Sequence, residues 1–86
     1  MPKVSSFYGI IIMMFYDEHN PPHFHVKYGE FNAQIRISDF GIMNGKLPSK
    51  ALALTIEWAA EHQKELTDNW NRAMNNETIL SISPLL

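Results

Sequence analysis

Three of the four histidines of this chain lie within seven residues. His19, His23 and His25 sit on either side of two adjacent prolines, and the chain then continues into a stretch of alternating apolar and polar residues. Histidine titrates closer to neutral pH than any other side chain, and it is also the commonest metal ligand. The cluster therefore indicates one candidate site, for proton transfer, for an anion or for a metal ion.

Two imidazoles on one strand face could act as general base and general acid on a phosphodiester. In that hypothesis His23 and His25 are the catalytic residues and Arg36 stabilises the developing charge. The same face, with Lys27 and Gln34, could instead bind a phosphate or a carboxylate. A solvated outer sheet face is the third interpretation, because polar side chains usually occupy such faces in antiparallel sheets. The residue types alone leave these interpretations open.

A metal site is the remaining chemistry to weigh. His23 and His25 are two residues apart, so a strand projects both imidazoles the same way, and His19 could add a third. Asp17 and Glu18 are near in sequence, but neither stands at a spacing typical of a fourth ligand. We therefore expect no metal ion and no other cofactor.

Residues 23–28 and 31–38 are predicted to form a β-hairpin that positions these side chains. Apolar and polar residues alternate in both segments, and Gly29 begins a two-residue connection of the kind that closes hairpins. The turn sets a register in which His23 lies opposite Arg36, and every pair matches apolar with apolar or polar with polar. This register predicts a shared polar face made of His23, His25, Lys27, Asn32, Gln34 and Arg36.

Residues 8–16 are predicted to form an earlier strand, because they are rich in β-branched and aromatic side chains. Both faces of this strand are apolar, so each must be covered by the chain itself or by a partner. Self-association would make the protein a homodimer. Alternatively, a partner could add a strand to this segment, or to a short strand that we predict at 79–83.

Residues 48–76 are predicted to form one long helix that covers the apolar face of the sheet. Pro48 suits the first turn, and an apolar stripe follows at helical spacing: Leu52, Ile56, Ala59, Gln63, Leu66, Trp70 and Met74. Trp58 and His62 flank this stripe one turn apart, which favours ring stacking at the edge of the core. The predicted fold class is therefore α+β, with a small antiparallel sheet of three to four strands and one long helix packed on one face.

Length and composition exclude several classes of protein. A chain of 86 residues, 45% hydrophobic and 19% charged, is expected to form a single domain over residues 1–86 and not a disordered segment. The net charge of −2 provides no general attraction to nucleic acid, so such binding would need a local patch. There is no cysteine, which excludes disulfides and thiolate chemistry. The longest apolar run is far shorter than the roughly 20 residues that cross a bilayer, so we expect a cytoplasmic protein with no membrane contact.

The segment Pro21-Pro22-His23-Phe24-His25-Val26-x-Tyr28-Gly29 resembles a family of small bacterial proteins classed only as a domain of unknown function. Further matches are Gly45-Lys46-Leu47-Pro48, Glu57-Trp58-Ala59 with His62, Glu65-Leu66, Trp70 and Ile82-x-Pro84-Leu85. The resemblance implies membership of a two-gene module similar to toxin–antitoxin pairs, with a cognate small protein as partner. It implies no activity. The family pattern includes Tyr28, Trp58 and His62, so these three join Lys27, Gln34 and Arg36 as candidate binding residues.

Three functions follow from these expectations. The first is protein–protein interaction, as one component of a toxin–antitoxin-like module. The alternatives are a metal-independent ribonuclease-type toxin that uses His23 and His25, and a nucleic-acid-binding regulator that works through the hairpin face. Interaction ranks first because the apolar strand needs covering under any hypothesis, whereas the histidines do not require chemistry.

Overall fold

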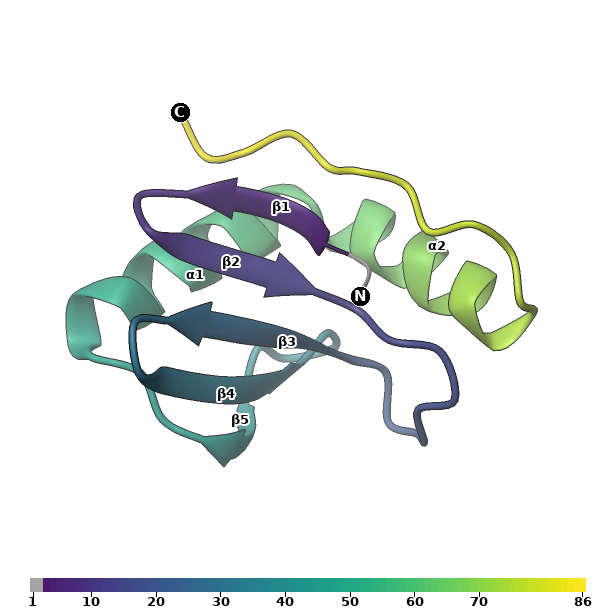
Figure 1. Cartoon of the computed structure of the whole chain (residues 1–86), viewed down its shortest axis with the longest axis horizontal. Coiled ribbons are helices and arrows are strands. Elements are labelled where there is room, and N and C mark those ends of the chain that lie inside the picture. Colours follow the sequence, from purple (N-terminus) through teal and green to yellow (C-terminus); the bar gives the residue numbers. More distant parts are fainter. Residues whose placement is uncertain (1–2) are drawn as a thin grey trace.

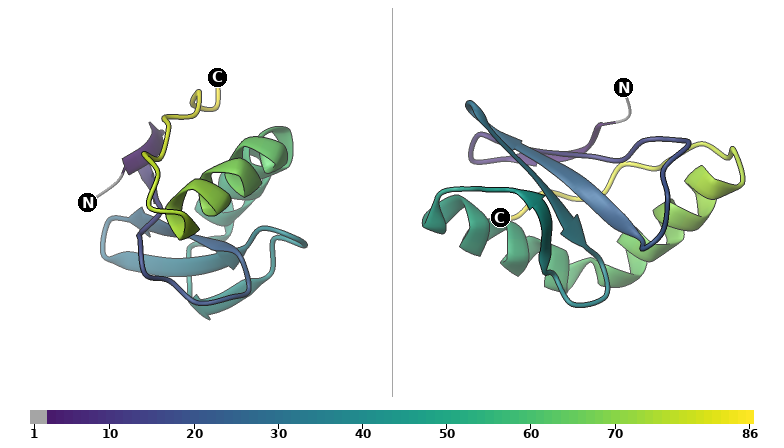
Figure 2. Two further views of the ribbon diagram at one scale, coloured as in Figure 1. Left: turned by 90° about the vertical axis from the view of Figure 1, so that its right-hand side faces the viewer. Right: turned by 90° about the horizontal axis from the view of Figure 1, so that it is seen from below.

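Five antiparallel strands follow one another in chain order across a single sheet (Figure 1). The computed structural model describes residues 3–86. The strands are β1 (Lys3–Phe7), β2 (Ile10–Met13), β3 (His23–Tyr28), β4 (Phe31–Arg36) and β5 (Ile42–Gly45). The helices α1 (Ser49–Glu61) and α2 (Gln63–Met74) then cover one face of this sheet (Figure 2). The α+β class and the antiparallel sheet are confirmed, but the prediction of three to four strands and one helix is wrong.

The segment predicted as one strand over residues 8–16 contains a reversal of the chain. Tyr8 and Gly9 both have positive φ, at 49° and 81°, and they connect β1 to β2. β2 therefore pairs with β1 on one side and with β3 on the other. Because both edges of β2 are occupied within the chain, a partner has no edge there to extend.

The two faces of β2 and the residues after it are covered unequally. Ile10, Ile12 and Met14 are buried in the core beneath the helices. On the opposite face Met13 is 9% exposed, and Ile11 and Phe15 are half-buried. The chain thus covers one apolar face itself and leaves the other partly open to solvent.

The predicted hairpin is confirmed in its register. All six expected cross-strand pairs are present, from His23 opposite Arg36 to Tyr28 opposite Phe31. Phe24, Val26, Ala33 and Ile35 point into the core, at 4% exposure or less. This alternation places the polar residues of both strands on the opposite face, as the sequence pattern predicted, and the helices leave that face open except at His23, which α2 covers.

The long helix of the prediction is divided in two at His62. The N–H of His62 donates to the carbonyl of Ala59, three residues back, and the backbone of His62 leaves the helical region at φ −124°. The chain changes direction there (Figure 2), and the side chain of Gln63 donates to the carbonyl of Ile37 at 2.8 Å. The sequence has no proline or glycine at the break, so the apolar stripe was predicted to continue through it. Gln63 and Met74, which were both placed on that stripe, are exposed. Among residues 3–86, no helix has the length and apolar character that crossing a membrane requires.

The C-terminal segment runs beside β1 (Figure 1) and does not form the strand predicted at 79–83. The N–H of Ile82 donates to the carbonyl of Val4 at 2.9 Å, and Ile82 and Leu85 are buried in the core. This segment therefore covers the outer side of β1. Within the described residues, β5 is left as the sheet edge that no neighbouring strand or segment pairs with.

Asn69 fastens the C-terminal segment to α2. Its amide donates to the carbonyl of Leu80 at 2.8 Å and accepts from the N–H of Leu80 at 3.0 Å, and its side chain is 1% exposed. Asn69→Ala leaves both groups unpaired, so we expect the free energy of unfolding to fall by about 2 kcal/mol. Urea denaturation measures this loss, and limited proteolysis should show earlier cleavage after residue 77. Asn71→Ala, exposed on the same helix, is the control; an equal loss in both variants would contradict the assignment.

Candidate functional site

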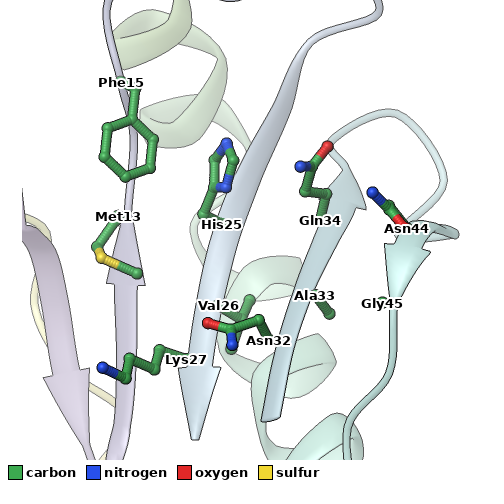
Figure 3. A pocket seen from close by; sticks show the side chains of 10 residues that line it. All are labelled: Met13, Phe15, His25, Val26, Lys27, Asn32, Ala33, Gln34, Asn44 and Gly45. Carbon is green, nitrogen blue, oxygen red and sulfur yellow. The ribbon is translucent and has the colours of Figure 1, made fainter. Parts of the chain in front are cut away.

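The helix-free face of the sheet carries a groove with a volume of about 340 Å³. One row of directly paired residues crosses four strands beneath it: Met13, His25, Gln34 and Asn44. Figure 3 looks onto this face, with the helices behind the sheet. The groove is therefore built by strand register, which places side chains from β2 to β5 in line.

The lining of the groove changes character from one side to the other (Figure 3). Met13 and Phe15 supply apolar surface at the β2 side, whereas the amides of Asn32, Gln34 and Asn44 lie on β4 and β5. Lys27 also lines the groove, and it forms no ion pair with any other residue in the range 3–86. Such a surface offers dispersion contacts, hydrogen-bond donors and acceptors, and one positive charge.

His25 lies in the wall of this groove. Its Nε2 is 2.6 Å from Oε1 of Glu18, and the Phe15 ring packs edge-on against the imidazole at 4.6 Å between centroids. The side chain of His25 is 20% exposed and that of Glu18 is 25% exposed. His25 is thus held in one orientation by a charged partner while part of its ring stays accessible.

His23 is placed differently, although it shares the strand face of His25. Its side chain is only 4% exposed, and its ring lies 5.2 Å from that of Trp70 on α2. Its Nδ1 lies 2.9 Å from the carbonyl oxygen of Pro21. His23 therefore does not belong to an open polar face opposite the helices, as the register alone predicted, because α2 and residues 18–22 cover the start of β3.

Glu18, His23 and His25 form a compact trio. One potential ligand atom from each residue lies within 4.8 Å of the other two. His19, which was weighed from the sequence as a third ligand beside His23 and His25, is exposed and lies outside this trio. The spacing of Glu18 from the histidines in the sequence is irregular and does not indicate a ligand; only the folding back of residues 14–22 brings its carboxylate to the two imidazoles.

Arg36 is engaged away from the groove. Its Nη1 donates to both carboxylate oxygens of Asp39, at 3.0 and 2.8 Å. The N–H of Gly41 also donates to this carboxylate, and that bond, followed by the contact with Arg36, holds the pKa of Asp39 below its usual value. Of the predicted anion-binding face, His25, Lys27, Asn32 and Gln34 line the groove, whereas His23 and Arg36 do not.

The other three candidate binding residues also lie outside the groove. Trp58 is fully buried in the centre of the core rather than at its edge, and its Nε1 donates to the carbonyl of Ser83 at 2.8 Å. His62 lies next to Trp58, at 5.5 Å between ring centroids, but the rings are tilted by 43° and are not stacked; its Nδ1 lies 2.6 Å from Oε1 of Glu65. Tyr28 lines a separate cavity of about 470 Å³ between the β1–β2 turn and α1.

Six residues that line the groove were not expected on this face: Met13, Phe15, Val26, Ala33, Asn44 and Gly45. Met13 and Phe15 belong to a segment that is apolar on both faces, Val26 and Ala33 to the apolar face of the hairpin, and Asn44-Gly45 is a dipeptide typical of turns. Residues 42–45 show no alternation of apolar and polar side chains, so the sequence carries no strand signal that would place Asn44 on this face. Pairing of β5 with β4 decides the matter.

Comparison with known proteins gives one match. The model of a family described as a domain of unknown function (DUF4160) matches residues 9–71. No curated protein and no solved structure matches the chain. The matched range includes β2 to β5, both helices up to residue 71, and every residue that lines the groove.

Proposed function

Because the chain belongs to the DUF4160 family, whose function is unknown, we propose its function from the site: it binds another protein, whose extended segment lies in the groove beside β5. The observation that carries this proposal is the position of the groove. It lies on the helix-free face and reaches β5, the unpaired edge of the sheet in the described range. An extended segment can bind both features at once, by adding a strand and by inserting side chains.

The chemistry of the groove supports a polypeptide as the occupant. Three amide side chains can donate to and accept from peptide groups, and Met13 and Phe15 can receive apolar side chains. Ile42 on β5 is 40% exposed, which adds an apolar contact at the edge itself. A strand paired with β5 would cover Ile42 and continue the sheet by one strand.

The resemblance of residues 21–29 to small bacterial proteins of two-gene modules supports a particular partner. We propose that the partner is the cognate small protein encoded beside this one, in a toxin–antitoxin-like module of the bacterial cytoplasm. A second copy of the chain, in a homodimer, is the other partner that the experiment must identify. We do not propose that a partner adds a strand to β2 or to residues 79–83, because those segments are already paired or packed within the chain.

Cleavage of RNA is the second candidate function, and the contact between His25 and Glu18 is the observation that favours it. A carboxylate at 2.6 Å orients the imidazole, as in many general bases, and His25 adjoins the groove. His23, however, is 4% exposed and packs against Trp70, so a bound strand does not reach it without an opening of the site. Regulation through nucleic-acid binding has weaker support, because Lys27 is the one cationic residue among those that line the groove.

Two substitutions in the groove test the proposal. Gln34→Arg and Asn44→Arg place bulk and charge where we expect the partner to lie, and each should weaken binding of the cognate protein at least about tenfold. Ser38→Arg, exposed outside the groove, is the control for the added charge. Isothermal titration calorimetry measures affinity after co-expression has established the complex, and light scattering gives the mass of the chain alone.

The possible outcomes separate the candidates. A complex that forms equally well with all three variants contradicts groove binding. If the chain alone is a dimer and Asn44→Arg makes it a monomer, the partner in the groove is a second copy of the chain and not the cognate protein. Growth arrest on expression that disappears with His25→Ala, together with RNA cleavage by the purified chain, favours the enzyme.

A further inference from the structure

We propose that Glu18, His23 and His25 form a binding site for a divalent transition metal ion of the zinc class. One potential ligand atom from each residue lies within 4.8 Å of the others, before any ion draws them together. Two imidazoles and one carboxylate are the protein ligands of many zinc and ferrous sites that keep an open coordination position. This inference is independent of the proposed protein binding.

The hydrogen bond that His23 makes with Pro21 decides which of its ring nitrogens carries the proton. Nδ1 lies 2.9 Å from the carbonyl oxygen of Pro21, and a carbonyl only accepts, so Nδ1 carries the proton. In the neutral ring Nε2 then has a free lone pair, which is the form that binds metal ions. A backbone carbonyl on the other nitrogen is also the usual outer partner of a metal-binding histidine.

The environment of Nε2 of His23 is the second observation that points to a metal ion. It is buried, and it has no hydrogen-bond partner in the part of the chain that the structure describes. Its charged neighbour is Oε2 of Glu18, at 3.7 Å. A buried lone pair that faces a carboxylate is two acceptors turned toward each other, which is unfavourable unless a positive charge lies between them. A metal ion supplies that charge; the other source is a second proton on His23.

The contacts of Glu18 with the two imidazoles bracket the separation that a tetrahedral ion requires. Zinc–nitrogen bonds of about 2.0–2.1 Å place neighbouring ligand atoms roughly 3.3 Å apart. Oε2 of Glu18 lies 3.7 Å from Nε2 of His23 and Oε1 lies 2.6 Å from Nε2 of His25, on either side of that separation. The shorter contact is a hydrogen bond, and the ion takes the place of its proton, which is released to solvent. Glu18 is 25% exposed, so rotation of its side chain can even out the two distances.

Solvent reaches this site from one side. His23 closes it toward α2, whereas His25 and Glu18 are both partly exposed. Three protein ligands leave a fourth position for water or for a side chain of a bound molecule. Because His25 also lines the groove, that position adjoins the groove. The proposal departs from the expectation of no metal, which rested on the absence of a carboxylate at a regular spacing.

Titration of the full-length chain, stripped of metal with a chelator, tests the site. Zinc is followed by calorimetry and Co²⁺ by its visible absorption. We expect one ion per chain in the wild type, with binding at least about a hundredfold weaker in Glu18→Gln and in His25→Ala. His19→Ala removes an exposed histidine from the same loop and should bind the ion as the wild type does.

Thermal unfolding gives a second readout. Zinc should raise the Tm of the wild type and of His19→Ala, but not that of Glu18→Gln. The proposal is overturned if the wild type binds no ion, or if His19→Ala loses binding as much as Glu18→Gln does. Nitrogen-15 NMR of the wild-type imidazoles decides the case without variants: His23 protonated on both nitrogens, and unchanged by zinc, also overturns it.

Discussion

Trp58→Ala is expected to lower the free energy of unfolding by about 4 kcal/mol, the largest stability loss that we predict for a single side chain. Trp58 lies on α1, and its side chain is fully buried against the sheet. Its ring centroid is 5.4 Å from that of Phe7 and 6.2 Å from that of Phe24. The substitution leaves a cavity and also removes the donor that holds the carbonyl of Ser83. The whole free energy of unfolding of a small domain is about 5–15 kcal/mol, so this substitution removes a large share of it. Urea denaturation followed by circular dichroism measures the change.

The neighbouring Glu57 provides the matched control for this experiment. It is exposed on the same turn of α1, and Glu57→Ala should change stability by less than about 0.5 kcal/mol. Trp58→Phe keeps an aromatic ring but loses the indole N–H, so its loss should lie between those of the other two variants. A Trp58→Ala protein as stable as Glu57→Ala would contradict the placement of Trp58 in the core.

Gly45→Ala is expected to lower the free energy of unfolding by about 3 kcal/mol and to loosen β5 from β4. Gly45 has φ of +78°, and a Cβ added there would clash with the backbone oxygen of Asn32. Backbone atoms of β4 have to move to admit a methyl group, which disturbs the pairing of Ala33 with Gly45. Urea denaturation measures the loss. Hydrogen exchange of the backbone amides should be accelerated by the substitution more in β5 than in β2.

Gly29 separates the cost of backbone conformation from the cost of the contact. It also has a positive φ, +57°, but a Cβ added there meets no atom within 4 Å. Gly29→Ala should therefore cost only about 1 kcal/mol, from the left-handed backbone alone. Equal losses in the two variants would show that the close approach of β4 at Gly45 contributes nothing. Because Gly45 also lines the groove, Gly45→Ala should weaken partner binding, whereas Gly29→Ala should not.

The hairpin of β3 and β4 shows how much of the site followed from the sequence. A two-residue connection and strict alternation are local signals, and one choice of register satisfies all six pairs. The position of His25, Lys27 and Gln34 on one face was therefore predictable. Arg36 was placed on the same face correctly, but its pairing with Asp39 depends on the turn after β4.

Other features had no local signal. β1 has a weakly apolar sequence and becomes a strand through its pairing with β2 and its contact with Ile82. The helix break at His62 lacks proline and glycine, and the contact of Gln63 with Ile37 across the fold accompanies it. Hydrophobic periodicity describes an element in isolation, so it does not report where another part of the chain interrupts that element.

The sequence by itself thus determined the fold class, the hairpin and its register, because turn chemistry and alternation act between residues close in the chain. Only the tertiary structure decided that α2 buries His23, that residues 14–22 bring Glu18 to the two imidazoles, and that β5 is an open edge. These outcomes depend on which distant segments pack together. Such packing is set by the summed burial of the whole core and not by any spacing within one segment.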